Sequence, residues 1–382
     1  INDSYGHEAG DTVLKQIAIR TRTTLRAEDM VARLGGDEFV ILIEGDTDRA
    51  SLELQVERLR SAIGRPILHD KTRIDATISV GIATYTHDST SFSHVMREAD
   101  IALYASKQAG RDCVTFFNTE MGAAAIARDR MEVELRQAVR AGEFILHYQP
   151  RLDIKTGRII GAEGLVRWLH PTRGLISPCA FIPICEETGL IEELGRIVLE
   201  IGCKQAIKWR RAGLDLNISL NVSPRQFADV GFLTTLEDLA ALPDFPKDKI
   251  ELEVTETVLI GDPDLIAEKL RAITAIGYRI AIDDFGTGYS NLSYISQFPL
   301  TCLKIDRSFI DQLPESGPIV QLILTLGKQV GATVVSEGVE TQAQLDWLME
   351  NNCEEAQGYL ITPPLVTNEL EPFVRKLNKN IT

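Results

Sequence analysis

The sequence has few of the features that tie a chain to an oxidising compartment, a membrane or a polyanion. Its six cysteines are scattered and form no CxxC pair, which disfavours a disulfide framework or a zinc site and favours reduced thiols. It contains no apolar run of about 18 residues and no signal peptide. Basic residues are in deficit, 40 against 55 acidic ones, and the formal net charge of -15 repels nucleic acid and anionic membranes. We therefore expect a cytoplasmic protein with no nucleic acid polymer as partner, whose phosphate-bearing ligands need local cations.

Length and composition indicate more than one globular domain. The 382 residues exceed what one hydrophobic core usually serves, and 44% of them are hydrophobic and 25% charged. The chain begins at Ile1, inside what looks like a motif. We expect an upstream portion that includes a sensor domain or a membrane anchor.

Residues 1–117 show the order of helices and short strands that is typical of an antiparallel α+β domain. The first helix is expected over "GDTVLKQIAIRTRTTL", capped by Asp11, with an apolar face formed by Leu14, Ile17, Ala18 and Leu25. "MVARL" and "FVILI" should pair as a hairpin around the "GGDE" turn, because Gly35 and Gly36 tolerate positive φ. "ATISVGIATY" predicts a further strand between two more helices.

Residues 118–142 predict a helical connector. Its apolar stripe consists of Met131, Leu135, Ala138 and Val139, and Gly142 closes it. The stripe favours a first helix that packs on the following domain.

From residue 143 to residue 382, apolar strands recur with helical intervals between them. In order, the strands are "FILHYQP", "IIGAEGLVRW", "NISLNVS", "IELEVTE", "YRIAIDDFG", "TCLKIDR", "ATVVSEGVE" and "EEAQGYLI". Eight strands with intervening helices predict a (β/α)8 barrel of the TIM type.

Most of these strands end in a polar residue. The set comprises Gln149, Glu163, Asn221, Glu253, Asp283, Asp284, Lys304, Glu337 and Gln357. Because the carboxyl ends of barrel strands form the active-site face, these side chains should converge on one cleft. Five carboxylates in one pocket repel one another unless cations lie among them, and all-oxygen ligand sets favour Mg²⁺ or Mn²⁺. The adjacent Asp283 and Asp284 can serve two metals about 3.5–4 Å apart.

The same residues resemble the EAL-domain cyclic di-GMP phosphodiesterases. "AEGLVRW" resembles the Glu-Ala-Leu motif, and "NVS", "ELEVTET", "DDFGTGYSNL", "LKIDRSFI" and "SEGVET" follow in the order of the family. The resemblance covers residues 143 to 373 and implies hydrolysis of cyclic di-GMP to linear pGpG.

This resemblance also implies roles for the cleft residues. Glu163, Asn221, Glu253 and Asp283 would hold one metal, and Asp283 and Asp284 the second. Lys304 would hold the attacking water, and Glu337 would act as general base or orient that water. The substrate would be contacted by Gln149 and Arg167, with Gln357 supporting the site beside them. Glu256 resembles the glutamate that anchors the "DFGTGYS" loop, whose Gly286 and Gly288 allow it to move.

Two positions depart from the EAL pattern. Gly164 stands where the motif has alanine, which adds backbone freedom beside Glu163 but removes no ligating atom. Thr301 stands where many relatives carry an acid, and this change could alter the coupling of the loop to a dimer.

The first domain resembles the GGDEF diguanylate cyclases, which condense two GTP molecules into cyclic di-GMP. "ARLGGDEFVIL" resembles the signature, and "NDSYGHEAGD" and "ALYASKQAGRD" match its flanking motifs. The resemblance implies GTP with Mg²⁺ as ligand. It assigns metal binding to Asp37 beside Glu38, and nucleotide contacts to Asn2, Asp11, Gly35, Gly36, Lys107 and Arg111.

The "RAED" segment fits the inhibitory product site of that family through Arg26 and Asp29, although a helix-end ion pair is the competing interpretation. The strand that carries another metal-binding aspartate would precede Ile1. We therefore expect poor cyclase activity from this chain, and the domain could instead bind GTP and regulate the barrel.

Two alternatives to the phosphodiesterase remain open. The barrel could be a receptor that binds cyclic di-GMP without cleaving it, or a two-metal enzyme for another phosphodiester. Whichever function holds, we expect a homodimer in a bacterial cytoplasm. The protein would be anchored to the membrane if an upstream part supplies an anchor.

Overall fold

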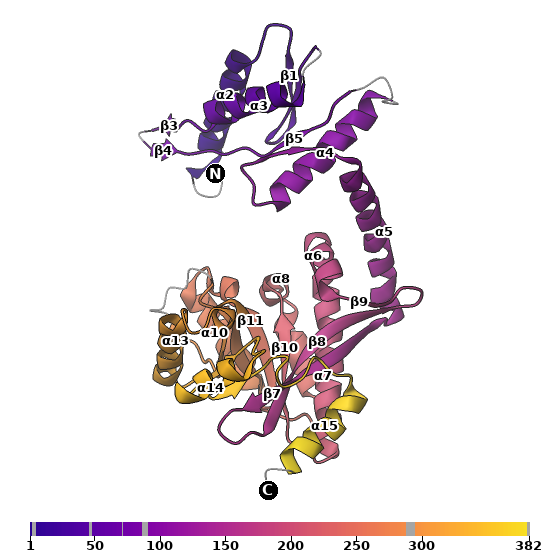
Figure 1. Ribbon diagram of the computed structural model, residues 1–382, viewed down its shortest axis with the longest axis vertical. Coiled ribbons are helices and arrows are strands. Elements are labelled where there is room, and N and C mark those ends of the chain that lie inside the picture. The colour runs from indigo at the N-terminus through magenta and orange to yellow at the C-terminus, as the bar shows by residue number, and fades with distance from the viewer. Residues whose placement is uncertain (2–4, 46–47, 71, 86–90, 288–294, 380–382) are drawn as a thin grey trace. The chain divides into compact units, whose positions relative to one another are not determined.

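The computed structural model describes residues 1, 5–45, 48–70, 72–85, 91–287 and 295–379. The chain divides into two compact units, Ile1–Asp129 and Arg130–Thr382 (Figure 1). The division falls within helix α5 (Thr119–Ala141), which occupies the predicted connector. Three residues of its predicted stripe, Leu135, Ala138 and Val139, are buried in the core of the second unit.

The first unit contains three long helices and three pairs of strands among its described residues. The helices are α2 (His7–Thr24), α3 (Arg49–Ile63) and α4 (Phe92–Gln108). The antiparallel pairs are β1 (Met30–Gly35) with β2 (Glu38–Leu42) and β3 (Ile67–His69) with β4 (Thr72–Ile74). The third pair, β5 (Val80–Ile82) with β6 (Val114–Phe116), is parallel. The predicted GGDE hairpin is therefore present, whereas strands of three residues are too short to show a pattern in the sequence.

Two details of the first helix differ from the prediction. Helix α2 begins at His7 after Gly6, so Asp11 lies inside the helix and does not cap it. The buried residues are Ala9, Gly10, Val13 and Thr21, and of the predicted stripe Ile17 packs against this core. Leu25 lies just after the helix ends.

Close packing of α4 on β5 depends on one glycine. A Cβ atom at Gly81 would lie 2.1 Å from the backbone nitrogen of Leu103, a distance that no side chain tolerates. The sequence "SVGIA" therefore places glycine where helix and strand backbones touch.

The second unit is a closed eight-stranded barrel, as the sequence predicts. Its strands are β7 (Phe144–Asp153), β8 (Ile159–His170), β10 (Asn217–Val222), β11 (Ile250–Thr255), β12 (Arg279–Phe285), β13 (Cys302–Ile305), β14 (Thr333–Ser336) and β15 (Glu355–Ala356). The pairing of β8 with β10 closes the ring, and β9 (Gly174–Ile176) extends β8 outside it.

One barrel strand runs against the others. Strand β7 is antiparallel to both of its neighbours, β8 and β15. It is joined to β8 by a tight turn in which the Thr156 N–H donates to Asp153 Oδ1 and Gly157 has a φ of 68°. A turn this short cannot carry the helical crossover that a parallel pair requires.

Helices follow most of the parallel strands and pack on the barrel. They are α6 (Pro178–Thr188), α7 (Leu190–Arg211), α8 (Pro224–Ala228), α9 (Phe232–Ala240), η1 (Glu256–Leu259), α10 (Pro263–Ile276), α12 (Arg307–Asp311), α13 (Gly317–Val330), α14 (Gln342–Glu350) and α15 (Thr367–Lys379). In the described ranges of the chain, no helix has both the length and the apolar character needed to cross a membrane.

Candidate active site

Lys304 on β13 lies at the centre of a buried acidic cluster inside the barrel. Its ammonium group is fully buried, so it depends on neighbouring carboxylates for charge compensation. The Nζ atom lies 2.5 Å from Glu337 Oε1, 2.7 Å from Glu253 Oε2, 3.0 Å from Asp283 Oδ1 and 3.6 Å from Glu163 Oε2. The prediction that strand-end residues converge is met by these five side chains, which come from five different segments.

Two amide side chains hold the Glu163 carboxylate in place, and a third contacts one of them. Asn221 Nδ2 donates to Glu163 Oε1 at 2.7 Å, and Gln357 Nε2 donates to Glu163 Oε2 at 2.6 Å. Gln357 Nε2 also donates to Gln149 Oε1 at 3.1 Å. Although β7 runs in the opposite direction, Gln149 is therefore part of the same cluster.

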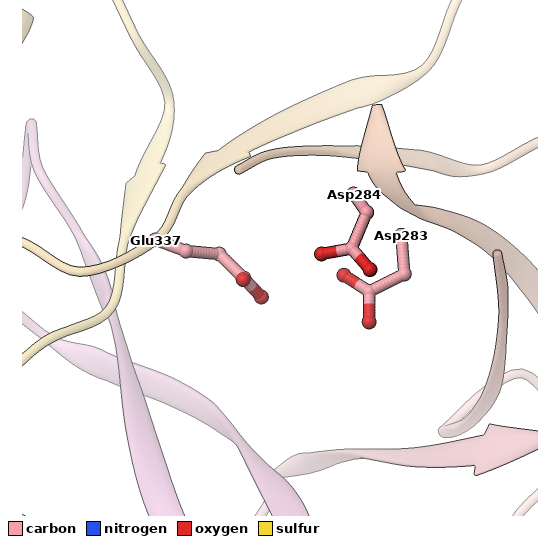
Figure 2. A group of neighbouring side chains, drawn as sticks. All are labelled: Asp283, Asp284 and Glu337. Atoms are coloured by element: carbon pink, nitrogen blue, oxygen red, sulfur yellow. The ribbon is translucent and has the colours of Figure 1, made fainter. Parts of the chain in front are cut away.

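Asp283, Asp284 and Glu337 form the open side of the cluster. One carboxylate oxygen from each lies within 4.8 Å of the others. Figure 2 shows the two aspartates at the end of one strand, with Glu337 facing them across the space between. Asp284 has a φ of 53°, a left-handed conformation that is uncommon for a residue other than glycine. This conformation at the end of β12 lets two adjacent residues contribute to the same space.

The protein alone does not neutralise these acids. Burial, followed by the nearby Glu163 carboxylate, raises the pKa of Glu253 well above its usual range. Burial also raises the pKa of Glu337 to about 8, although Lys304 opposes the shift. The pKa of Asp284 is raised by burial and by Asp283. For Glu163, burial is outweighed by Lys304 together with hydrogen bonds from its amide neighbours, and the pKa stays low.

The donor set fits divalent cations. Glu253 Oε1 is buried and has no hydrogen-bond partner in the part of the chain that the structure describes. Carboxylate and amide oxygens are the ligands that Mg²⁺ and Mn²⁺ prefer, and added positive charge would let Glu253, Asp284 and Glu337 ionise together. The residues that could hold such ions are Glu163, Asn221, Glu253, Asp283 and Asp284.

Comparison with known proteins identifies both units. The model of the family "EAL domain" matches residues 132–364, and that of "Diguanylate cyclase, GGDEF domain" matches residues 1–113. The chain is a tandem GGDEF–EAL protein. We therefore call the barrel the EAL domain and the first unit the GGDEF domain.

Relatives of known name share this arrangement. The bifunctional diguanylate cyclase/cyclic di-GMP phosphodiesterase MucR of Pseudomonas aeruginosa is 39% identical over 376 residues, which are 97% of this chain and 54% of MucR. The cyclic di-GMP phosphodiesterase NbdA of the same organism is 38% identical over 379 residues, 98% of this chain and 48% of NbdA. The chain thus spans about half the length of these relatives.

Solved structures resemble the EAL domain. A MucR phosphodiesterase in complex with cyclic di-GMP has a TM-score of 0.61 and 39% identity, and covers 63% of this chain and 99% of its own. The EAL enzyme Bd1971 with bound cAMP and cyclic di-GMP has a TM-score of 0.62 and 30% identity, and covers 75% of this chain and 77% of its own.

Glu256 reaches the loop that follows β12. This residue begins η1 directly after β11, and its Oε2 accepts the backbone N–H of Gly286 at 3.2 Å. Gly286 has a φ of 98°, so glycine suits the turn there. The contact agrees with a loop anchor, which stays a prediction because Gly288 lies outside the described residues.

A side chain at position 164 would point away from that of Glu163. A methyl group at position 164 would lie 2.8 Å from Leu220 Cδ2 and 3.3 Å from Leu146 Cδ1. Leu220 is fully buried and also fills the space beside Gly202 of α7. The side chain of Leu220 therefore occupies the space that the methyl group of the motif alanine would need.

Arg167 and Thr301 lie at opposite ends of their strands. Arg167 is near the carboxyl end of β8, where Nη1 donates to Val166 O and partial burial lowers the pKa of its guanidinium. Thr301 directly precedes β13, where its hydroxyl donates to Ile280 O at 2.9 Å. The role predicted for each stays a prediction.

The GGDEF domain presents most of its predicted ligand residues to solvent. Asp11, Gly35, Gly36, Asp37, Glu38, Lys107 and Arg111 are exposed, and Asn2 lies outside the described residues. Gly36 has a φ of 53°, as the predicted hairpin turn requires. Ligand binding by these residues stays a prediction.

Asp29 of the predicted inhibitory site has local partners. Its side chain is buried and accepts the backbone N–H groups of Arg26 at 2.9 Å and Glu44 at 3.4 Å. Asp29 thus stabilises the turn between α2 and β1, while the Arg26 side chain remains exposed.

One buried polar group of the barrel was not found from the sequence. Arg151 on β7 contacts Glu251 and Glu355 in the barrel interior, next to the residues described above. Its signal was present, because Ser219, Glu251 and Glu355 each stand two residues before a predicted site residue.

Proposed function

We propose that the EAL domain is a metal-dependent phosphodiesterase that hydrolyses cyclic di-GMP to linear pGpG. The main support for this proposal is the cluster of four carboxylates around the buried Lys304, with the exposed Asp284 beside it, in which Glu253, Asp284 and Glu337 have raised pKa values. Such a cluster needs divalent cations to become fully ionised. The names of MucR and NbdA and the complex of MucR with cyclic di-GMP support the choice of substrate.

The side chains of the cluster divide the chemical work. Bound divalent ions would supply charge to the phosphate oxygens and lower the pKa of the attacking water. Glu337 would accept the proton of that water, and its position opposite Asp283 and Asp284 supports this role. Lys304, 2.5 Å from Glu337, fixes the orientation of this carboxylate and stays protonated among its acidic neighbours.

Substrate recognition would use the β7–β8 side of the cleft. Arg167 offers a planar guanidinium suited to a phosphate, and Gln149 offers an amide beside Glu163. Attack of water on phosphorus would form one P–O bond and break the bond to one ribose oxygen. That oxygen would take up a proton from solvent, and the ring would open to pGpG.

The GGDEF domain would bind GTP with Mg²⁺. It would then either make cyclic di-GMP from GTP or regulate the barrel by binding GTP. The family match over residues 1–113 supports a nucleotide ligand.

The decisive experiment measures conversion of cyclic di-GMP by this chain with Mg²⁺ or Mn²⁺, with and without GTP. Formation of pGpG that Glu163→Ala abolishes would support the enzyme, and a change with GTP would support regulation. Tight binding of cyclic di-GMP without turnover would contradict the proposal and favour a receptor. Turnover of other phosphodiesters in preference to cyclic di-GMP would contradict the choice of substrate.

A further inference from the structure

A second layer of buried polar side chains lies directly beneath the metal-site residues, centred on Arg151. The guanidinium is 1% exposed and reaches three strands. Nη1 lies 2.5 Å from Glu251 Oε1 and donates to Ser219 Oγ at 2.6 Å, and Nη2 lies 2.7 Å from Glu355 Oε2. Glu251 and Ser219 are fully buried, and Glu355 nearly so.

Each partner of Arg151 stands two residues before a residue of the proposed site. Alternate side chains of a strand face the same side, so each pair projects into the barrel at successive levels. The pairs are Ser219 with Asn221 on β10, Glu251 with Glu253 on β11, and Glu355 with Gln357 at β15. Arg151 therefore joins three strands at the level just below their site residues.

The reversed direction of β7 gives Arg151 this position. Gln149 contacts Gln357 in the upper layer, which is the layer of the proposed site residues. Arg151 comes two residues later on the same strand. In a parallel strand a later residue would lie nearer the carboxyl-end face, whereas in β7 it lies deeper. One strand thus supplies a contact to both layers.

The lower layer has balanced charge. Glu251 and Glu355 face Arg151, and Arg279 Nη2 lies 3.5 Å from Glu251 Oε2. Two acids therefore face two guanidinium groups, and the forked geometry of Arg151 fixes the directions of both carboxylates. This layer has no need of a metal.

We propose that Arg151 is a positioning residue for the metal site, holding β10, β11 and β15 so that Asn221, Glu253 and Gln357 converge with the spacing that divalent ions require. The inference rests on the proposed metal-dependent function. Small errors in ligand position weaken a metal site, and loss of a supporting contact typically lowers metal affinity about 10–100-fold.

The test removes the charge of Arg151 together with the charges of its two carboxylate partners. Arg151→Met alone would strand two carboxylates, so the variant combines Arg151→Met, Glu251→Gln and Glu355→Gln. Leu236→Ala, a fully buried residue of α9 outside both layers, serves as the control because it lowers stability through a cavity. Both proteins are compared with the wild-type chain well below their Tm.

The primary readout is the Kd for Mn²⁺ by calorimetry, with kcat and KM for cyclic di-GMP measured beside it. We expect the triple variant to bind Mn²⁺ about 10–100-fold more weakly and to lose kcat with little change in KM. The Leu236→Ala protein should keep the wild-type Kd for Mn²⁺ despite its lower Tm. If the folded triple variant binds Mn²⁺ as tightly as the wild type, Arg151 has no positioning role.

The same data separate this inference from the proposed function. If the wild-type chain binds Mn²⁺ but does not cleave cyclic di-GMP, the proposed phosphodiesterase activity is contradicted. The Mn²⁺ affinities of the variants would still test the positioning role of Arg151. A wild-type chain that binds no Mn²⁺ would overturn both. If the triple variant does not fold, the Arg151→Lys variant is measured instead, with Glu251 and Glu355 intact. The lysine ammonium cannot make the forked contact of the guanidinium, so an Mn²⁺ affinity equal to that of the wild type would overturn the inference.

Discussion

Two buried glutamates on β11 have the same burial and opposite ionisation behaviour. Glu251 is 0% exposed and Glu253 is 1% exposed, and the two side chains face the same interior with one residue between them. Burial opposes ionisation of Glu251, but Arg151 and Arg279 outweigh it and the pKa is lowered. The pKa of Glu253 is raised by burial and then by the Glu163 carboxylate.

Because the two side chains are equally buried, the difference between their pKa shifts comes from their neighbouring charges. The lower layer is complete within the protein, because arginines face its acids. The upper layer holds four acids around Lys304 and Asp284 beside them, and we propose that ions from outside balance its charge. Groups with raised pKa in a pocket are candidates for function for this reason.

The largest expected effect is that of Glu253→Gln. Loss of this carboxylate should raise the Kd for Mn²⁺ by at least about 100-fold and lower turnover of cyclic di-GMP about 1,000-fold, because a charged ligand is removed. The metal-free variant should be as stable as the wild type or more so, since the raised pKa of Glu253 disfavours its charged form there. Calorimetry and urea denaturation measure these quantities, and a less stable metal-free variant would refute the assignment of Glu253.

Glu251→Gln should behave in the opposite way. Removal of this charge leaves Arg151 and Arg279 short of one counter-ion and should cost about 3 kcal/mol in the free energy of unfolding. The glutamine oxygen can still accept from Arg151, so the Kd for Mn²⁺ should change less than 10-fold, which is about 1.4 kcal/mol. The two variants are measured side by side. A loss of stability in Glu253→Gln but not in Glu251→Gln would contradict the proposed difference between the two glutamates.

The metal-free protein should lose stability as the pH rises from about 4.5 to about 8. The folded-state pKa of Glu337 is about 8, above its usual value, so the folded protein holds a proton that the unfolded chain releases. The stabilisation is complete below the unfolded pKa and is lost as the pH approaches the folded pKa. Thermal melts across this range should show the decline, and Glu337→Gln should flatten it. Saturating Mn²⁺ should offset the loss of stability, because cations favour the ionised form of Glu337. If the decline with pH is the same in Glu337→Gln, other groups cause it.

A smaller effect is expected from Gly164→Ala, which restores the family motif. The added methyl would meet Leu220 Cδ2 at 2.8 Å and should cost about 1–3 kcal/mol of stability through overpacking. Turnover should change little, since the methyl points away from Glu163. Adding Leu220→Val should recover part of the loss, and additive losses in the double variant would show that Leu220 is not the cause.

The sequence predicted the barrel and the converging acids because each strand is an apolar run that ends in a polar residue. Glu163, Glu253, Asp283, Lys304 and Glu337 were all expected in one cleft, and the structure brings them together. The order of the motifs along the chain also specified the family.

The reversed direction of β7 was not predictable from its apolar pattern, which carries no direction. The indication lay in the turn that contains Thr156 and Gly157, which is too short for a crossover helix. Arg151 escaped notice for the same reason, because its position beneath the site follows only when β7 is reversed. The start of α2 was misjudged because Gly10, which suggests a boundary, lies inside the helix.

We propose that external cations complete the upper layer of acids. The most direct test is calorimetric titration of Mn²⁺ into the chelator-treated chain at pH 7 in two buffers of different ionisation enthalpy. We expect two ions to bind per chain with release of protons, because Glu253, Asp284 and Glu337 must ionise as the ions enter. Absence of binding, or binding without proton release, would contradict it.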